Sequence, residues 1–384
     1  MPATAPSAIA PPNTAPPNTA PPSTAPPNTA PPSPGESRRA AGQRSTDLER
    51  AIAREPAAFR VLTGDRPTGP LHLGHYFGTL QNRVRLQDAG VELFVLIADY
   101  QAITDRTAGA GLPDDVLGLV ADYLAVGIDP GRAVIFAHSQ VAALHQLLLP
   151  FLSLVSVAEV GRNPTVKDEM AAAGPGGVTA LMFSYPVHQA ADILSVHASV
   201  VPVGQDQLPH LELARTIARR FNDRYSPGQP YFREPAALLG AAPLLLGTDG
   251  TKMSKSRGNA VPIRATADQS ARLIAGARTD AERVITYEPQ RRPEVANLLL
   301  LAALCRDEPP EKVAAEIGAA GAAALKRAVT DAVNQRFAPF RRLRADLARD
   351  PGYLRSVLAA GNERVSAIAE QTLAAVRALM HTSY

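Results

Sequence analysis

Two histidines stand in a Gly- and Pro-rich stretch, Gly64 to Leu80 (GDRPTGPLHLGHYFGTL), which the pattern predicts to be a turn that opens into a helix. His72 and His75 are three positions apart, so they share one side of the first helical turn. Each can donate a hydrogen bond, and either could carry charge near neutral pH. The start of a helix attracts phosphate, and Gly74 would let a ligand lie close to the backbone. The stretch therefore predicts a phosphate site, and the alternative is an ordinary helix start with two surface histidines.

A second stretch, Gly247 to Ser256 (GTDGTKMSKS), concentrates lysine in a chain that otherwise uses arginine. The sequence holds 34 Arg and 5 Lys, and two of the five are Lys252 and Lys255. A lysine ammonium is a compact charge on a flexible stem, suited to a moving phosphate. The spacing predicts that both ammonium groups face one ligand, and Gly247 and Gly250 predict a hinged loop. The alternative is a solvated basic turn.

Alternating strand and helix patterns indicate how these stretches are positioned. Short β-prone runs occur at 58–63, 92–98, 133–137 and 199–203, and a helical pattern spans 113–126. This order predicts a Rossmann-like parallel sheet with ligands at the carboxyl edge of its strands. After residue 264 the chain is rich in Ala, Leu and Arg, which predicts a helical region. Phe337, Phe340 and Tyr353 in that region could stack on RNA bases, although such aromatics are more often part of a core.

The segment 185–192 (YPVHQAAD) is the best candidate for side-chain recognition. On a helix, Tyr185, Gln189 and Asp192 share one face. A single Asp on an otherwise apolar face is costly unless a group donates a hydrogen bond to it. The segment therefore predicts a ligand contact at Asp192, and the alternative is a helix cap or an internal structural hydrogen bond.

Composition narrows the class of protein. The net charge is +3, but residues 326–384 contain ten Lys or Arg against five Asp or Glu, so the basic surface lies toward the C-terminus and suits an RNA backbone. The alternative is a solvated helix face. Cys305 is the only cysteine and is expected to be a buried thiol; no metal-binding motif is present.

The repeated APPNT unit in residues 2–36 predicts a disordered tail without the pattern of a signal peptide, and we expect its removal to leave catalysis intact. The Leu-rich run 141–160 is interrupted by polar residues and Pro150, so we predict a buried, kinked helix and no membrane span.

Taken together, HLGH and KMSKS resemble the paired signature of class I aminoacyl-tRNA synthetases. Further segments resemble the bacterial tryptophanyl-tRNA synthetase family, in order and at matching separations, from about residue 58 to the C-terminus: ADYQAIT, AVGIDP, SYPVHQAADIL and VPVGQDQLPHLELARTIARRFN. The resemblance implies ATP-dependent activation of L-tryptophan and its transfer to tRNA(Trp), in a cytoplasmic homodimer, with ATP and with Mg²⁺ bound to the nucleotide. The composition of the N-terminal segment predicts a disordered tail at 1–40, and the resemblance implies a catalytic domain at 56–262 and a helical anticodon-binding domain at 263–384.

The same resemblance assigns the candidate site residues. The catalytic residues would be His72, His75, Lys252 and Lys255, with no metal ligand in the protein. Asp192 would accept a hydrogen bond from the indole N–H, Tyr185 would lie near the substrate ammonium, and Gln189 and Gln207 would complete the tryptophan site. The ATP-binding residues would be Arg66, Pro67, Thr68, Gly74, His75, Gly204, Gln205, Asp206, Lys252, Met253, Ser254, Lys255 and Ser256.

Three positions depart from the family pattern. Many tryptophanyl enzymes carry Met where this chain has Gln189, Gln where it has Arg66, and Glu where it has Gln205, and these differences bear on substrate affinity and inhibitor sensitivity. The combination of Tyr, Gln and Asp at this spacing also occurs in tyrosyl enzymes. The alternatives that the sequence leaves open are therefore a tyrosyl-specific synthetase and a synthetase-like paralogue that binds ligands or proteins without charging tRNA.

Overall fold

The computed structural model describes residues 34–103, 111–172, 177–240, 244–255 and 257–384. It divides into two compact units, Met1–Ala40 and Ala41–Tyr384. The APPNT repeats and Ser256 lie outside the described residues. The first helix begins at Pro34, so the boundary of the tail that the sequence suggested near residue 40 falls within a helix.

A five-stranded parallel sheet forms the centre of the larger unit. Its strands are β1 (Arg60–Asp65), β2 (Glu92–Ile97), β3 (Ala133–Ala137), β4 (Val200–Val203) and β5 (Ala236–Leu239), in the order β3-β2-β1-β4-β5. The predicted Rossmann-like sheet is confirmed, and β5 is an edge strand that the sequence reading missed. The strand order reverses between β1 and β4, where sheets of this kind bind ligands at the carboxyl edge.

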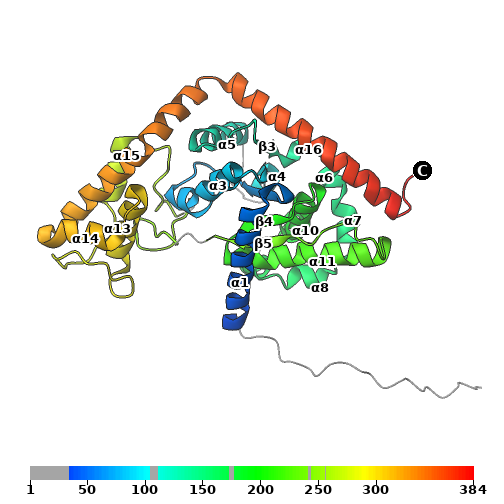
Figure 1. Ribbon diagram of the computed structural model, residues 1–384, viewed down its shortest axis with the longest axis horizontal. Helices are drawn as coiled ribbons and strands as arrows, with labels where there is room; N and C mark the ends of the chain where they lie inside the picture. Colours follow the sequence, from blue (N-terminus) through cyan, green and yellow to red (C-terminus); the bar gives the residue numbers. More distant parts are fainter. Residues whose placement is uncertain (1–33, 104–110, 173–176, 241–243, 256) are drawn as a thin grey trace, which may run out of the picture. The chain divides into compact units, whose positions relative to one another are not determined.

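Helices cover both faces of the sheet and then continue alone to the C-terminus (Figure 1). Those within and before the sheet region are α1 (Pro34–Arg54), α2 (Leu73–His75), α3 (Gln81–Ala89), α4 (Asp99–Ala102), α5 (Leu112–Val126), α6 (Ala142–Gln146), α7 (Leu148–Leu152), α8 (Val157–Gly161), α9 (Pro164–Ala172), α10 (Ala180–Ser195) and α11 (Leu208–Tyr225). Those after it are α12 (Ala267–Ala275), α13 (Pro293–Arg306), α14 (Pro310–Ile317), α15 (Ala322–Ala348) and α16 (Pro351–Leu379). The predicted helical region after residue 264 is confirmed.

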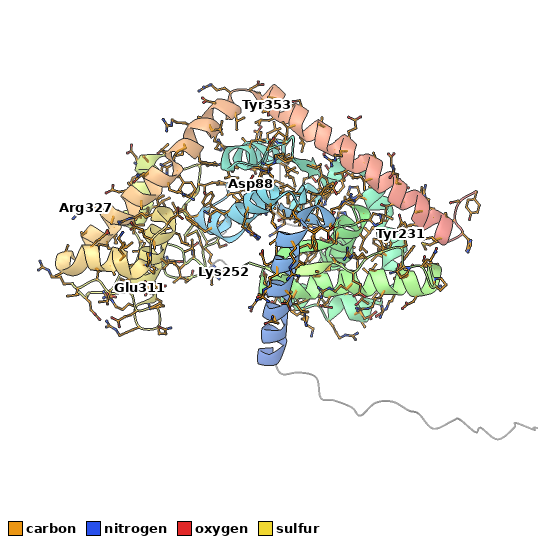
Figure 2. All side chains as sticks on the ribbon, viewed as in Figure 1. Asp88, Tyr231, Lys252, Glu311, Arg327 and Tyr353 are labelled. Atoms are coloured by element: carbon orange, nitrogen blue, oxygen red, sulfur yellow. The ribbon has the colours of Figure 1, made fainter. Side chains whose placement is uncertain are left out.

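Two hydrophobic cores lie on opposite faces of the sheet because successive strand residues point in opposite directions. In β1, Val61 packs into one core and Leu62 into the other. The first core includes residues of α5, α13 and α15, among them Phe337 and Phe340, and the second includes residues of α10, α11 and α16. Phe337 and Phe340 are therefore core residues, whereas Tyr353 at the start of α16 is 42% exposed (Figure 2).

The last helix, α16, packs against the edge strand β3. Figure 1 shows α16, in red, running past β3 and α6. A Cβ atom added at Gly361 would lie 1.8 Å from the carbonyl oxygen of Ile135, so only glycine allows this approach. The next residue, Asn362, accepts a hydrogen bond from the backbone N–H of Ala137 over 2.9 Å. The C-terminal helix is thus an integral part of the sheet structure.

Three local predictions can be compared with the fold. The prediction of one kinked helix over 141–160 is wrong: the segment forms α6, α7 and α8, and a capping box between Ser156 and Glu159 starts the third. Cys305 is buried as expected, and burial raises the pKa of its thiol to about 12. Across the described parts of the chain, none of the helices has both the length and the apolar character needed to span a membrane.

Candidate active site

The HLGH turn lies at the carboxyl end of β1, as its position in the sequence predicts. His72 caps α2: the backbone N–H of His75 donates to His72 Nδ1 over 3.3 Å, and the backbone N–H of His72 donates to His75 Nδ1 over 3.1 Å. The two rings lie with their centroids 3.7 Å apart and their planes tilted by 37°. A Cβ at Gly74 would lie 3.0 Å from the His72 ring, so a side chain at this position would press on that ring.

Both histidines are neutral at neutral pH, which corrects the expectation that either could be charged. Burial lowers the pKa of His72 to about 3, with the neighbouring His75 as a further cause. Burial also lowers the pKa of His75 to about 4. Because Nδ1 of each ring accepts a backbone hydrogen bond, the ring proton resides on Nε2. The pair therefore offers two neutral N–H donors, which suits a phosphate oxygen.

A buried ion pair, absent from the sequence predictions, holds the end of β1. Arg83, 2% exposed, donates to Asp65 Oδ2 over 2.6 Å, and the Tyr123 hydroxyl donates to the same oxygen over 2.8 Å. Although burial alone would raise the pKa of Asp65, the Arg83 guanidinium holds it well below its usual range. Arg83 also donates to the carbonyl of Gly64. These contacts fix the backbone from which the turn departs.

The second predicted stretch meets the first. Lys255 Nζ donates to the carbonyl oxygen of Gly69 over 2.9 Å, and burial lowers the pKa of this lysine. Met253 is buried, with its Sδ atom 3.6 Å from the position of a Cβ on Gly74. The chain continues from this loop alongside the HLGH turn, since Leu73 N–H donates to Val261 O and Ile263 N–H donates to Leu71 O, each over 3.0 Å.

The two lysines do not share one helical face, which corrects the reasoning from their spacing. Lys252 takes part in an isolated β-bridge with Leu246, so the backbone there is extended, and its side chain is exposed (Figure 2). In this arrangement only Lys255 reaches the HLGH turn.

Asn259 organises the lysine loop, and sequence reasoning did not single it out. Its Nδ2 donates to Asp249 Oδ1 over 2.8 Å and to the carbonyl of Lys252 over 3.1 Å, while its Oδ1 accepts from the backbone N–H of Ser254 over 2.8 Å. Asn259 is only 3% exposed. A Cβ at Gly247 would lie 2.4 Å from this side chain, so the absence of a side chain at Gly247 lets Asn259 pack against the backbone there.

A cavity of about 280 Å³ opens at the point where the strand order reverses. It brings together residues from β1, β2, β4, α9 and α10 that are far apart in the sequence. The predicted residues that line it are Arg66, Tyr185, Gln189, Asp192 and Gln207, joined by Gly64, Asp65, Gln101, Thr165 and Met182, among others. Pro67 and Thr68 continue the turn beyond Arg66, where Thr68 N–H donates to Arg66 O over 2.9 Å.

The Tyr185 hydroxyl lies 3.1 Å from His210 Nε2 in the wall of this cavity. Asn163 Nδ2 faces His210 Nδ1 at 3.3 Å, and Asn163 Oδ1 accepts from the backbone N–H of Thr165. Burial lowers the pKa of His210 to about 4. The neutral ring therefore carries its proton on Nε2, the nitrogen that also lies 3.1 Å from the Thr165 hydroxyl. This network fixes the direction of the Tyr185 side chain.

The loop after β4 supplies the remaining predicted polar groups. Gly204, Gln205 and Asp206 are exposed at the carboxyl edge, and a Cβ at Gly204 would lie 2.5 Å from Asp206 Oδ1. Gln207 donates to Asp206 Oδ2 over 3.0 Å, and it also lines the cavity. These residues thus link the cavity with the exposed edge.

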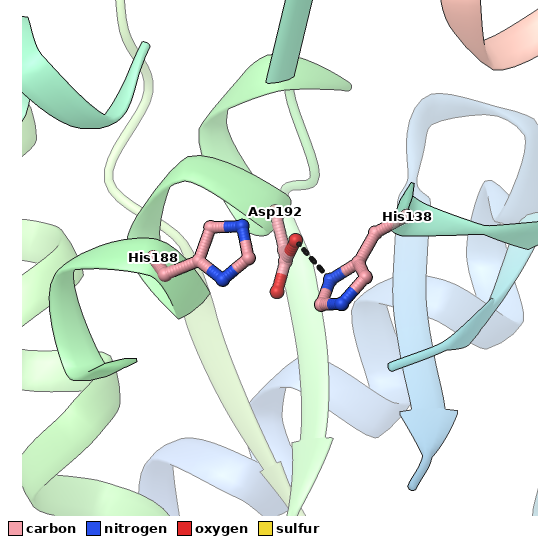
Figure 3. Close-up of side chains that lie close together, drawn as sticks. All are labelled: His138, His188 and Asp192. Carbon is pink, nitrogen blue, oxygen red and sulfur yellow. Dashed lines mark hydrogen bonds and ion pairs between the residues drawn. The ribbon is translucent and has the colours of Figure 1, made fainter. Parts of the chain in front are cut away.

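Asp192 is fully buried at the cavity and does have an internal donor. His138 Nδ1 lies 3.2 Å from Asp192 Oδ1, while Oδ2 has no hydrogen-bond partner among the described residues. Figure 3 shows the carboxylate between the rings of His138 and His188. The internal hydrogen bond that the sequence left open is therefore present at Oδ1, while Oδ2 is an available acceptor and the ligand contact stays a prediction.

The same three side chains are close enough to hold a metal ion, since their ligand atoms lie within 4.8 Å of one another. However, the backbone N–H of Tyr100 donates to His138 Nε2 over 2.9 Å. A metal on Nδ1 of a neutral ring would require a proton on Nε2, directed at that N–H. The hydrogen bonding therefore favours an N–H donor at Nδ1 over a metal ligand. No sequence motif could have revealed this cluster because its residues come from separate segments.

Comparison with known proteins agrees with this geometry. The model of the family of class I tRNA synthetases (W and Y) matches residues 54–338, so the chain belongs to this family of aminoacyl-tRNA synthetases. The chain is 38% identical over 336 residues to tryptophan–tRNA ligase of Streptococcus agalactiae serotype V, covering 84% of this chain and 98% of the relative. It is 37% identical over 333 residues to the same enzyme of Clostridium longisporum, with 84% and 97% covered.

Solved structures give the same result. Tryptophanyl-tRNA synthetase of Campylobacter jejuni, complexed with ADP and tryptophan, superposes with a TM-score of 0.74 at 31% identity, covering 84% of this chain and 99% of the other. Tyrosyl-tRNA synthetase of Archaeoglobus fulgidus superposes with a TM-score of 0.61 at 23% identity, which is a likeness of fold alone. The resemblance stated from the sequence is confirmed at the level of family and fold.

Proposed function

We propose that this chain joins L-tryptophan to tRNA(Trp), with ATP converted to AMP and pyrophosphate. The observation that carries the choice of tryptophan is Asp192 Oδ2, a buried acceptor at a cavity and without a protein partner among the described residues. An indole N–H supplies the single donor that such an oxygen needs, and burying the acceptor unpaired would be costly. The tryptophan-specific relatives support the same choice.

In the first step, the tryptophan carboxylate attacks the α-phosphorus of ATP and pyrophosphate leaves. The protein needs no nucleophile of its own, because positioning and electrostatic stabilisation suffice. Tyr185 and Gln189 flank the amino-acid ammonium, with Gln207 beside them. Gly204, Gln205 and Asp206 lie at the edge where the ribose of ATP would sit, and Arg66 to Thr68 border the phosphates.

The neutral Nε2–H groups of His72 and His75 stabilise charge on the phosphate, and Lys252 and Lys255 follow the departing pyrophosphate. Met253, Ser254 and Ser256 are the other residues of this loop that we assign to the ATP site. Mg²⁺ enters with the nucleotide and offsets phosphate charge when bound. The second step transfers the tryptophanyl group to the terminal ribose of tRNA.

The region 263–384 is proposed to bind the anticodon end of tRNA. Three exposed arginines support this role: Arg327, Arg342 and Arg355, for which the described residues provide no ion-pair partner. Others of the basic set serve the fold, since Arg344 pairs with the buried Asp122 and Arg341 donates to Ser270. Tyr353 is an exposed aromatic residue of this region.

The proposal also covers the oligomeric state of the enzyme and its location in the cell. A homodimer is supported by Leu149 and Val157, which are 75% and 76% exposed in the segment where this class packs its subunits. We place the protein in the cytoplasm, with its tRNA.

Amino-acid-dependent exchange of pyrophosphate into ATP tests the proposal. We expect exchange with tryptophan and at least a hundredfold weaker exchange with tyrosine, followed by tryptophan transfer to tRNA. Asp192→Asn should raise the KM for tryptophan about a hundredfold, because the amide can present N–H groups to the indole N–H. The exposed Asp268→Asn on α12 is the matched control and should leave the KM unchanged. Exchange with tyrosine alone, or with neither amino acid, would overturn the proposal in favour of a tyrosyl enzyme or a non-charging paralogue.

A further inference from the structure

We infer that His138, His145 and His188 together hold Asp192 with its Oδ2 as an acceptor and leave no free ring N–H beside the carboxylate, which favours a substrate side chain that carries an N–H group over one that carries a hydroxyl group. The inference rests on the proposed function and adds three positioning residues to it. None of the three is among the residues that the resemblance assigns to tryptophan contacts, although His188 lies in the same segment as Tyr185, Gln189 and Asp192.

The first step concerns Asp192 Oδ1. His138 is fully buried, and its Nε2 accepts the backbone N–H of Tyr100 over 2.9 Å, so its ring proton is on Nδ1 and is donated to Asp192 Oδ1. Asp99 Oδ1 lies 3.5 Å from the same Nε2 and accepts hydrogen bonds from the backbone N–H groups of Ser139 and Tyr100. The one N–H of His138 is thereby committed, and it holds the Asp192 carboxylate in a single orientation.

The second step concerns His145. Its Nε2 lies 2.6 Å from the carbonyl oxygen of His138, which can only accept, so Nε2 carries the proton. Burial lowers the pKa of His145, so the ring is neutral at neutral pH and its Nδ1 has a lone pair.

That lone pair fixes the proton on His188. His188 Nε2 lies 3.0 Å from His145 Nδ1 and must therefore donate to it. Burial also lowers the pKa of His188, which leaves its Nδ1 without a proton. This Nδ1 is buried and has no partner among the described residues, as is also true of Asp192 Oδ2. The carboxylate lies between the rings of His138 and His188 (Figure 3).

The consequence is a difference between two aromatic substrates. An indole nitrogen has one hydrogen and no in-plane lone pair, so a single acceptor satisfies it. A phenol can donate to Asp192 Oδ2, but its oxygen lone pairs then also need a donor. The nearest ring nitrogens offer none: His138 has committed its proton, and His188 Nδ1 is itself an acceptor. Unpaired polar groups in a buried site reject a ligand strongly, so the phenol is disfavoured.

Two-bond ¹H–¹⁵N NMR of the full-length enzyme labelled with ¹⁵N-histidine tests the proton positions directly. At pH 7.5 we expect a proton on Nδ1 of His138 and on Nε2 of both His145 and His188, with assignments from single His→Gln variants. A proton on Nδ1 of His188, or on both of its nitrogens, would overturn the inference. This measurement needs no catalytic activity.

A pair of variants at His145 tests the consequence for selectivity. His145→Phe removes the acceptor from His188 Nε2, so His188 can move its proton to Nδ1 and donate to Asp192 Oδ2. We expect the KM for tryptophan to rise at least about tenfold, kcat to change less than about threefold, and the preference for tryptophan over tyrosine to fall at least about tenfold. His145→Gln can still donate to His138 O and accept from His188, so it should restore values near those of the wild type.

The outcomes separate this inference from the proposed function. Wild-type enzyme without tryptophan-dependent exchange would end the proposed function. Wild-type exchange together with an unchanged preference in a folded His145→Phe would overturn only the role of the histidines. If His145→Phe does not fold, the NMR result on the wild type decides alone.

Discussion

Lys255 Nζ donates a hydrogen bond to the carbonyl oxygen of Gly69 over 2.9 Å, although 186 positions separate the two residues in the chain. The contact joins the lysine loop to the turn that precedes α2, so an ammonium group already lies beside the proposed phosphate site. Each partner comes from one of the two stretches that first suggested the chemistry. Their proximity is the structural condition on which the proposed activation step depends.

Changing Lys255 to Ala should lower kcat for tryptophan activation about 10²- to 10³-fold while the Kd for tryptophan changes less than about threefold. The reason is that the ammonium acts on the departing pyrophosphate and not on the amino acid. Lys252→Ala should act in the same direction. The control is Lys312→Ala, an exposed lysine of α14 paired with Glu308, which should leave kcat unchanged. Equal losses in kcat and tryptophan affinity would contradict the proposed role.

Replacing Arg327, Arg342 and Arg355 together by Ala should weaken tRNA binding and leave pyrophosphate exchange intact. Each exposed guanidinium that contacts a phosphate releases counterions, so the variant should also show a smaller dependence of tRNA affinity on salt. Filter binding at several salt concentrations gives both quantities. Arg50, Arg219 and Arg291, exposed but held in ion pairs, provide a triple Ala control of equal charge. An unchanged slope in the test variant would place the tRNA contacts elsewhere.

Gly361→Ala should destabilise the protein by several kcal/mol, because the new Cβ would overlap the carbonyl of Ile135 in β3. Gly118→Ala in the interior of α5 is the matched control. Its Cβ would meet only the ends of the Arg264 and Arg344 side chains, at 3.5 and 3.9 Å, and Ala favours a helix by about 1 kcal/mol over Gly. Urea unfolding of both variants compares them. Similar free energies of unfolding for the Gly361→Ala and Gly118→Ala variants would show that α16 does not pack closely against β3.

Replacing His210 by Gln should make the free energy of unfolding less dependent on pH in the acidic range. The pKa of His210 is lowered by burial to about 4 in the folded protein, against about 6.5 when exposed. Between these pH values the unfolded chain binds a proton that the folded chain does not, so stability falls as pH falls from about 6.5 to about 4. His210→Gln should lower that slope by up to about 1.4 kcal/mol per pH unit. Urea unfolding at half-unit steps of pH measures it, and parallel curves for the two proteins would rule out the shift.

The sequence determined the parts of the site whose signal is local. Glycines and prolines between a β-prone run and a helix mark the HLGH turn, and lysine in an arginine-rich chain marks the second loop. Strand and helix periods predicted the parallel sheet apart from its edge strand β5, because a buried strand and an amphipathic helix each leave a regular pattern. The spacing of Tyr185, Gln189 and Asp192 correctly placed all three at one cavity.

Tertiary structure alone decided which groups are charged, paired or packed. His72 and His75 are neutral because they are buried, and burial cannot be read from a spacing of three residues. Lys252 and Lys255 point differently because their loop is extended. Asn259 and Gly361 act through contacts with distant backbone, and His138 meets Asp192 across 54 positions. Such effects depend on distance in space and on the local dielectric environment, which exist only once the chain has folded.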